Sequence, residues 1–324
     1  MSVEELTSFE QLQAIEPLWM ELWNRDAAAT PFQSPLWLLP WFRHFGSGEL
    51  LTVAVRDNGR LDAIAPFFIL RDDDDPAESL GMLIGSGNSD YVDMLSSPDA
   101  PVDEVVARLV AADCAVWDLQ QLRSISPLLH VPAPPRWSDE IEDQDPCLVL
   151  SLDDLADRTS THFRKKLRYY RRSLEREGRL SIESPTAESL DDFMKALFEL
   201  HAARWKKRGL PGMLAAEIDQ SFHREVARGM LAAASLRMYS MRINDRVVAI
   251  FYGFAHHDTV YYYLSGYDPS LEKFSPGTVI VAHAIEQALR DGAKSFDFLR
   301  GAEEYKYAWG ATDRMNQRRR LIRG

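Results

Sequence analysis

The residues most suggestive of chemistry lie at the expected start of a helix. The segment "LEKFSPGT" precedes a long run with apolar residues at helical spacing. It places Lys273, Ser275, Gly277 and Thr278 around the helix start, with no acidic residue in the first turn. Free N–H groups and the helix dipole make such a start an anion site, and glycine lets a ligand approach the backbone closely. We therefore predict a phosphate-binding turn. The alternative needs no ligand, since Ser275 can be a simple N-cap followed by a first-turn proline.

A second candidate site is a cluster of cations on the helix expected from about residue 161 to 177. Its apolar residues recur at helical spacing and form one stripe under a basic face. The stripe consists of Phe163, Leu167, Tyr170 and Leu174. The cations are Arg164, Lys165, Lys166, Arg168, Arg171, Arg172 and Arg176. This face predicts a site for a phosphate, a charged sugar or an RNA backbone, with Arg164 and Lys165 as the substrate-binding candidates. The alternative is a solvated helix face partly balanced by glutamates.

Two further positions combine polar and aromatic character. Arg204 and Trp205 follow an expected helix and could form a platform for an acceptor, although a core tryptophan beside solvated cations is the competing interpretation. Asp297 alternates with Phe296 and Phe298 in an expected strand, so its side chain points away from theirs. A carboxylate at that position faces either solvent or a cleft. In a cleft it is a candidate general base.

The elements that must position these residues occur twice in the chain. The segments "VRDNGRLDAIAPFF" and "MRINDRVVAIFYGF" both predict a hairpin, with turns at Asn58-Gly59 and Asn244-Asp245. Each hairpin is followed by a strand, a helix that opens with proline, and another strand. A proline-rich, acidic linker separates the two halves. We therefore expect an α/β protein with mixed sheets and two similar domains, residues 1–150 and 151–324.

The two expected helices differ at their first turns. In the first half the turn reads "PVDE", so Asp103 and Glu104 would repel a phosphate, whereas "SPGT" in the second half is neutral. We predict that the first domain is non-catalytic and that the second holds the donor. The C-terminal tail "RMNQRRRLIRG" is expected to be an edge strand with exposed arginines.

Composition limits the remaining possibilities. The 324 residues are 46% hydrophobic and carry a net charge of −12, which argues against general affinity for DNA or anionic membranes. The sequence shows no secretory signal and no apolar run of transmembrane length, so we expect a cytoplasmic protein without membrane insertion. Cys114 and Cys147 suggest neither a disulfide framework nor a metal cluster. The acidic run "RDDDDP" lacks the spacing of a calcium loop and is expected to be an exposed loop.

Three segments of the sequence resemble a known protein family. The segments "YYYLSGYDPSLEKFSPGT", "FDFLRGAEEYKYAW" and "FRKKLRYYRRSLEREG" look like the CelD-type branch of the GNAT acyltransferases. The resemblance implies two tandem GNAT-like domains with the acyl-CoA N-acyltransferase fold and acetyl-CoA as acyl donor. Members of this branch often accompany polysaccharide biosynthesis. FemAB-like transferases are related, carry two GNAT-like halves and take an aminoacyl group from tRNA. The usual phosphate loop of the family, Arg/Gln-x-x-Gly-x-Gly/Ala, is not intact here, because residues 273–278 keep only one glycine and a nearby cation.

The resemblance also implies roles for individual residues. The acyl group would lie between the strands expected at 259–266 and 295–299, where a backbone N–H near Leu264, Ser265 or Gly266 would polarise its carbonyl. The short helix after the second strand would carry the general acid.

On that helix Tyr305 is the candidate acid, although it could instead form a packed face with Trp309. Glu304 is an alternative base to Asp297. Lys306 and Tyr267 are candidates for contacting the substrate, and a CoA 3′-phosphate is one possible partner of the basic helix.

The sequence thus favours transfer of an acetyl group from acetyl-CoA to an amine or hydroxyl of a small molecule or saccharide precursor. A FemAB-like transferase that uses aminoacyl-tRNA is the alternative, supported by the basic helix and opposed by the net charge. A third possibility is a non-catalytic binding protein that retains the fold.

Overall fold

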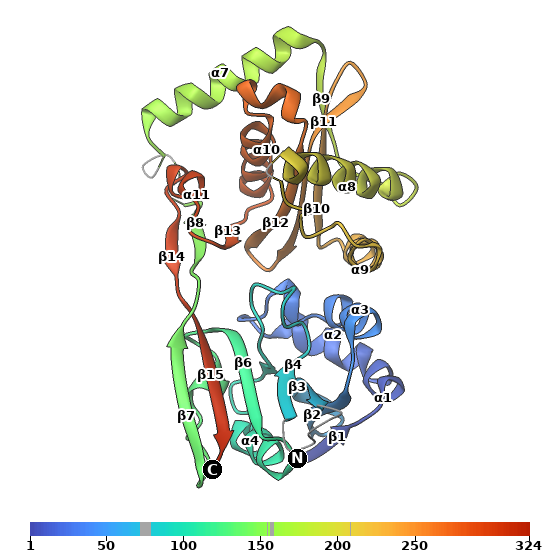
Figure 1. Ribbon diagram of the computed structural model, residues 1–324, viewed down its shortest axis with the longest axis vertical. Coiled ribbons are helices and arrows are strands. Elements are labelled where there is room, and N and C mark those ends of the chain that lie inside the picture. Colours follow the sequence, from blue (N-terminus) through green and yellow to red (C-terminus); the bar gives the residue numbers. More distant parts are fainter. Residues whose placement is uncertain (72–78, 154, 156–158, 208) are drawn as a thin grey trace. The chain divides into compact units, whose positions relative to one another are not determined.

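The computed structural model describes residues 1–71, 79–153, 155, 159–207 and 209–324, and the acidic run at residues 72–76 lies outside them. The chain divides into two compact units (Figure 1). Unit 1 comprises residues 1–146 and 315–324, and unit 2 comprises residues 147–314.

Unit 1 contains one mixed sheet with helices packed on it. Its elements are β1 (Ser2–Leu6), α1 (Phe9–Ala14), α2 (Glu16–Arg25), η1 (Pro31–Gln33), α3 (Pro35–Phe45), β2 (Glu49–Asp57), β3 (Arg60–Arg71), β4 (Ser79–Leu83), β5 (Leu95–Ser96), α4 (Val102–Ala111), β6 (Val116–Arg123), α5 (Pro127–His130), β7 (Trp137–Asp143) and β15 (Asn316–Arg323). The strand order is β1-β2-β3-β4-β6-β15-β7, with β5 paired to β3. Helix α4 packs Val105 and Leu109 into the same core as Trp117 of β6.

The C-terminal strand corrects two expectations. It belongs to unit 1 and not to the second domain, and it lies between β6 and β7 and not at an edge. Its arginines are only partly exposed, since Arg319 is 2% exposed and forms a bidentate ion pair with Asp139 at 2.8 and 2.9 Å. The acidic strand β7 provides the carboxylates that pair with the arginines of β15. The prediction that β15 is an edge strand, which rested on its charge alone, was therefore wrong.

Unit 2 contains the second mixed sheet. Its elements are β8 (Cys147–Ser151), α7 (Thr161–Glu177), β9 (Leu180–Glu183), α8 (Leu190–Lys207), α9 (Glu217–Ala232), β10 (Leu236–Ile243), β11 (Arg246–His256), β12 (Thr259–Tyr267), η2 (Pro269–Phe274), α10 (Pro276–Arg290), β13 (Ser295–Arg300), α11 (Glu304–Ala308) and β14 (Thr312–Arg314). The strand order is β14-β8-β13-β12-β11-β10-β9.

Helices cover both faces of the unit 2 sheet. On one face Phe251 of β11 packs in a core with α10 and with the apolar stripe of α7. The next residue, Tyr252, points the other way and contacts His223 of α9. Helix α8 packs against α9 and against β11 and β12. The sheet therefore separates a layer of α7 and α10 from a layer of α8 and α9.

The two units repeat the same construction, as the sequence predicts. The hairpins β2–β3 and β10–β11 turn through Asn58-Gly59 and Asn244-Asp245, and all four residues have positive φ. In each hairpin the register of strand pairing shifts two residues before the turn, at Val55/Arg56 and at Met241/Arg242. In each unit the next strand then pairs in parallel with the strand that follows the long helix, β4 with β6 and β12 with β13.

Replacing Arg319 by alanine should lower the free energy of unfolding by about 2–3 kcal/mol, because the change leaves Asp139 without its buried partner. Arg320→Ala is the matched control on the same strand, since its side chain is 36% exposed and pairs with Glu140 at the surface. That control should cost less than about 1 kcal/mol. Urea unfolding followed by circular dichroism measures both, and equal losses would contradict the buried role of Arg319.

Candidate active site

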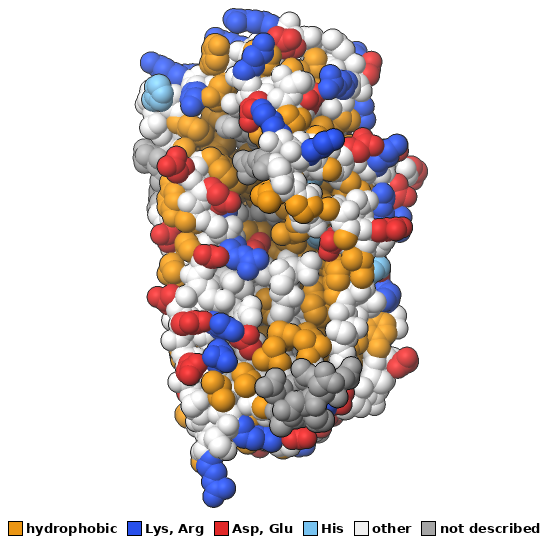
Figure 2. All heavy atoms as spheres, in the orientation of Figure 1, with side chains coloured by type: hydrophobic (Ala, Val, Ile, Leu, Met, Phe, Trp, Pro, Cys, Tyr) orange, Lys and Arg blue, Asp and Glu red, His pale blue; other side chains and the backbone are white. Residues whose placement is uncertain are grey.

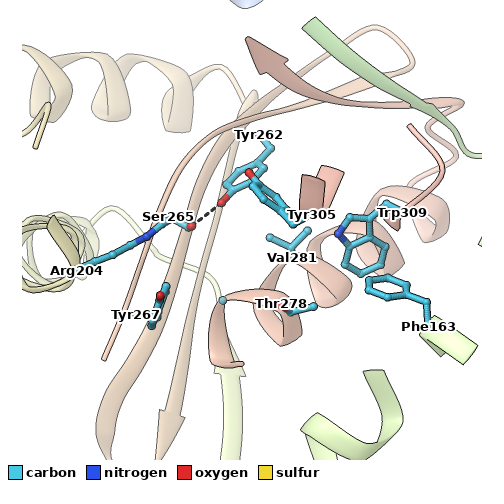
Figure 3. A pocket seen from close by; sticks show the side chains of 10 residues that line it. Phe163, Arg204, Tyr262, Ser265, Tyr267, Thr278, Val281, Tyr305 and Trp309 are labelled. Carbon is cyan, nitrogen blue, oxygen red and sulfur yellow. Dashed lines mark hydrogen bonds between the residues drawn. The ribbon is translucent and has the colours of Figure 1, made fainter. Parts of the chain in front are cut away.

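A pocket opens in unit 2 where two neighbouring strands stop pairing. The parallel pairing of β12 with β13 ends at Tyr261 and Asp297, although β12 continues for six residues and β13 for three. A cavity of about 190 Å³ lies beside the unpaired part of β12 (Figure 3). It is lined by Phe163, Arg204, Tyr262, Ser265, Tyr267, Gly277, Thr278, Val281, Tyr305 and Trp309. Since α8 and α10 both contribute, groups from both layers of the unit meet here.

A β-bulge determines which side chains of β12 face the pocket. The register between β11 and β12 shifts so that Tyr263 is the extra residue. In a regular strand, residues three apart point to opposite faces, and the extra residue brings Tyr262 and Ser265 to the same side. Their hydroxyl groups lie 2.5 Å apart. The Tyr262 phenol also interacts with that of Tyr305, so three hydroxyl groups form a chain along the pocket.

The pocket keeps these phenols protonated at neutral pH. Loss of water around the hydroxyl is the largest cause that raises the pKa of Tyr305, and the nearby Tyr262 and Glu303 raise it further. Burial likewise raises the pKa of Tyr262, against the opposing effects of its hydrogen bonds and of Arg204. The side chain of Tyr305 is nevertheless 43% exposed over its whole area, so its ring remains accessible from solvent. A neutral phenol in this position can donate a proton.

The start of α10 forms the opposite wall. Gly277 and Thr278, two of the predicted phosphate-binding residues, line the pocket, and no side chain caps this helix start. Ser275 has φ 50°, and its hydroxyl bonds Tyr170 of α7 and not the helix N–H groups. A Cβ at Gly277 would lie 3.1 Å from the Tyr267 ring, so glycine also permits close packing here. Lys273 lies outside the pocket lining, exposed and above the Phe274 ring.

The two candidate bases lie away from the pocket lining. Asp297 is fully buried, and its carboxylate accepts a hydrogen bond of 2.8 Å from the N–H of Leu299, which has φ 60°. Arg314 lies 3.9 Å from the same carboxylate. Asp297 therefore stabilises the irregular end of β13. Glu304 is exposed in the first turn of α11. Neither position provides a carboxylate to the pocket.

Lys306 is buried and does not line the pocket. It is 2% exposed, and its ammonium group donates to the carbonyl oxygens of Leu299, Arg300 and Gly301 at 2.7–3.1 Å. Glu303 completes its surroundings at 2.8 Å. These contacts fix the loop between β13 and α11, so Lys306 positions Tyr305 from behind.

The predicted acceptor platform separates into two parts. Arg204 reaches the pocket, where its guanidinium group lies 5.4 Å from the centre of the Tyr267 ring. Trp205 instead donates its indole N–H to His201 at 2.8 Å.

Of the strand residues predicted to contact the acyl group, Ser265 lines the pocket, whereas Gly266 faces α8. A Cβ at Gly266 would come within 2.7 Å of that helix. Leu264 pairs with Tyr252 of β11.

The basic face of α7 is exposed, and its apolar stripe packs on the core, as the sequence predicts. Figure 2 shows Lys and Arg side chains gathered at the end of unit 2 where α7 lies. Arg164 and Lys165 are part of this exposed face. Arg171 forms an ion pair with Glu175 at 3.3 Å, the one such pair within the described face.

Sequence reasoning missed four pocket residues, namely Phe163, Tyr262, Val281 and Trp309. Phe163 and Trp309 were predicted only to pack, and they do form an edge-to-face pair at 4.9 Å. Tyr262 could not be found from alternation, because the bulge at Tyr263 changes which face each residue of "YYYLSGY" occupies.

Within the described ranges, no group of three or more His, Cys, Asp or Glu side chains could hold a metal ion. None of the helices described combines the length and the apolar character needed to cross a membrane.

Comparison with known proteins identifies the domain around this pocket. Residues 161–307 match the family model of the acetyltransferase (GNAT) domain. This segment of unit 2 is therefore similar to a GNAT domain. No curated protein gave a significant sequence match. Because unit 1 repeats the element order of this domain, the fold is a tandem of two GNAT-like units.

Solved structures resemble this fold along nearly the whole chain, at identities that show the fold alone. The crystal structure of FemX has a TM-score of 0.67 and 10% identity, covering 98% of this chain and 97% of that one. L-PGS from Bacillus licheniformis has a TM-score of 0.60 and 12% identity, covering 96% and 91%. A conserved protein from Bacteroides thetaiotaomicron has a TM-score of 0.62 and 12% identity, covering 99% of both.

Lys306→Met should destabilise unit 2 by about 3 kcal/mol, because three carbonyl groups and Glu303 lose a buried cation. Lys165→Met, on the exposed face of α7, is the matched control and should change stability by less than about 0.5 kcal/mol. Thermal and urea unfolding measure both variants. Unchanged stability in Lys306→Met together with weaker acceptor binding would restore the predicted contact with substrate.

Proposed function

We propose that this protein is a GNAT-type acyltransferase that moves an acyl group from acetyl-CoA to an amine or hydroxyl of a small molecule or saccharide precursor. The observation that carries the proposal is the pocket at the unpaired edge of β12. It combines the uncapped first turn of α10 with the proton donor Tyr305. An acyl-CoA needs both, since its phosphates require an anion site and its leaving thiolate requires a proton.

In this proposal the donor lies along the α10 wall. The first turn, at Gly277 and Thr278, would receive the pyrophosphate, and the exposed cations Arg164 and Lys165 would lie near the 3′-phosphate. The acyl carbonyl would lie against the unpaired edge of β12, where a backbone N–H near Ser265 can stabilise the developing oxyanion. This edge has no strand partner in register after Tyr261 among the described residues.

The reaction then follows from the hydroxyl chain. The nitrogen or oxygen of the acceptor attacks the thioester carbonyl, and the tetrahedral intermediate collapses with cleavage of the C–S bond. Tyr305 donates its proton to the leaving thiolate. The resulting phenolate takes up, through Ser265 and Tyr262, the proton that the acceptor nitrogen or oxygen loses on forming the new bond to the acyl carbon. The pocket lining offers no carboxylate or histidine as base, so an amine would enter in its neutral form. The same geometry supports the proposal that unit 2, and not unit 1, is catalytic.

A second function is favoured by a specific observation, the exposed basic face of α7. FemX resembles this chain over 97% of its length. A FemAB-like reaction would take an aminoacyl group from tRNA, and the cations of α7 would bind phosphates of the RNA. Unlike CoA binding, this interaction should depend steeply on salt concentration.

Tyr305→Phe should lower kcat by about 10²-fold or more, because it removes only the hydroxyl that protonates the thiolate. Tyr307→Phe is the matched control on the same helix, where the phenol bonds Asp313 at the surface. Release of free CoA thiol measures turnover. Equal rates for wild type and Tyr305→Phe would assign Tyr305 to packing.

Gly277→Asp should weaken acetyl-CoA binding at least about tenfold, since a carboxylate replaces the neutral first turn. Gly277→Ala is the control for the close contact with Tyr267, because it adds the same Cβ without charge. Calorimetric titration with acetyl-CoA, and separately with tRNA, distinguishes the two donors. Binding of tRNA without acetyl-CoA, lost on neutralising Arg164 and Lys165, would favour the aminoacyl transferase. If neither donor binds, the chain keeps the fold as a non-catalytic binding protein.

A further inference from the structure

The pocket contains one charged group that the reaction leaves unused. Of the ten described residues lining it, Arg204 alone carries an ionised side chain. Its guanidinium group lies over the Tyr267 ring, and its Nε has no hydrogen-bond partner in the described part of the chain. No carboxylate of that part forms an ion pair with it. An arginine held in a pocket without an acidic partner is a receptor for a carboxylate or phosphate, whose oxygens match its planar fork.

The neighbouring carboxylates are already engaged elsewhere. Glu272, which accepts a hydrogen bond from the Tyr267 hydroxyl, forms an ion pair with Lys207. Glu303, which influences the pKa of both pocket phenols, pairs with the buried Lys306 at 2.8 Å. The lining around Arg204 is otherwise aromatic, aliphatic or neutral and polar. The pocket therefore has a net positive charge that an anionic ligand can balance.

The position of Arg204 separates this charge from the donor's phosphates. Arg204 ends in the pocket from α8, on the face of the sheet opposite α10. Figure 3 shows the Tyr267 ring between Arg204 and the first turn of α10. The Arg204 guanidinium group lies 5.4 Å from the centre of that ring, and a Cβ at Gly277 would lie 3.1 Å from it. The hydroxyl chain of Ser265, Tyr262 and Tyr305 runs past the same side chain. An anion on Arg204 would thus lie beside the reacting groups but outside the first turn of α10.

We propose that Arg204 binds an anionic group of the acceptor. The acceptor is then a small amine or alcohol that also carries a carboxylate or a phosphate near its nucleophilic atom. This inference rests on the proposed acyl transfer and adds the chemical class of the acceptor.

Direct binding tests the anion site without turnover. Succinate and inorganic phosphate are titrated calorimetrically into wild type, Arg204→Gln and Lys206→Gln, the last being an exposed cation on the same helix. At least one anion should bind wild type and Lys206→Gln about tenfold or more tightly than Arg204→Gln. The anion that binds distinguishes a carboxylate from a phosphate acceptor. Equal affinities in all three proteins, or no binding to any of them, would overturn the proposal.

Turnover then separates acceptor from donor. Acetyl transfer is measured to glycine against glycinamide, β-alanine against its amide, and phosphoethanolamine against ethanolamine. Wild type should prefer an anionic member at least about tenfold in kcat/KM, and Arg204→Gln should lose that preference.

Acetyl-CoA affinity should be the same in wild type and Arg204→Gln. A lower affinity in the variant, with the charge preference kept, would place the anion on the donor and overturn the acceptor assignment. Failure of acetyl-CoA to bind wild type would instead overturn the proposed acyl transfer. The succinate and phosphate titrations would then still decide whether Arg204 is an anion site.

Discussion

The divergence of β12 from β13 is the constraint on which the rest of unit 2 depends. The two strands pair through Tyr261 and Asp297 and then separate. Separation leaves backbone groups of both strands without ladder partners, which is costly unless other groups or a ligand satisfy them. The structure meets this requirement on the β13 side with Asp297, which binds the N–H of Leu299, and with Lys306, which binds three successive carbonyl oxygens. On the β12 side the edge remains open beside the cavity.

This arrangement explains the surroundings of two ionisable residues that the sequence singles out, Asp297 as a candidate base and Lys306 as a candidate contact to the substrate. A buried carboxylate and a buried ammonium group are expensive to desolvate, and each is retained where it satisfies several backbone groups at once. Asp297 and Lys306 both act on the loop that carries Tyr305 into the pocket. The polar groups exposed to the cavity are instead neutral hydroxyls and one arginine, which is a suitable lining for a reaction that develops charge only transiently.

The sequence was sufficient to predict the repeated architecture, and several of the residues that it singled out line the pocket. Asn58-Gly59 and Asn244-Asp245 mark hairpins because few other residues accept positive φ at two successive positions. The neutral first turn at Gly277 and Thr278 was identifiable because helix starts usually carry acids. The face of Tyr262 was not predictable, because a single extra residue at Tyr263 inverts the alternation.

Long-range partners were equally inaccessible. An arginine in "QRRRLIRG" looks exposed until Asp139 of β7 is known to lie across from it, about 180 residues earlier in the chain. The partners of Asp118 and Asp297, which occupy equivalent places in the two repeats, could not be predicted from the sequence either. Asp118 of β6 binds Arg318 of β15 at 2.6 and 2.9 Å, whereas Asp297 binds the backbone of its own strand.

In unit 1 the parallel pairing of β4 with β6 also ends early, at Gly81 and Trp117, but the groups beside these strands differ from those in unit 2. In unit 1 the strand after the long helix is β6. It pairs on its far side with β15, and Arg318 of β15 neutralises Asp118 of β6. The Trp117 ring of β6 fills the space beside Gly81. A Cβ at Gly81 would lie 2.2 Å from that ring. The first turn of α4 also presents Asp103 and Glu104 to solvent. A phosphate approaching α4 would meet two negative charges and no counterpart of Tyr305. In unit 2 the corresponding turn is neutral, and the corresponding strand ends in a loop that Lys306 holds in place. The charge at one helix start and the side chain that packs beside one strand therefore support the proposal that unit 2 is the catalytic unit.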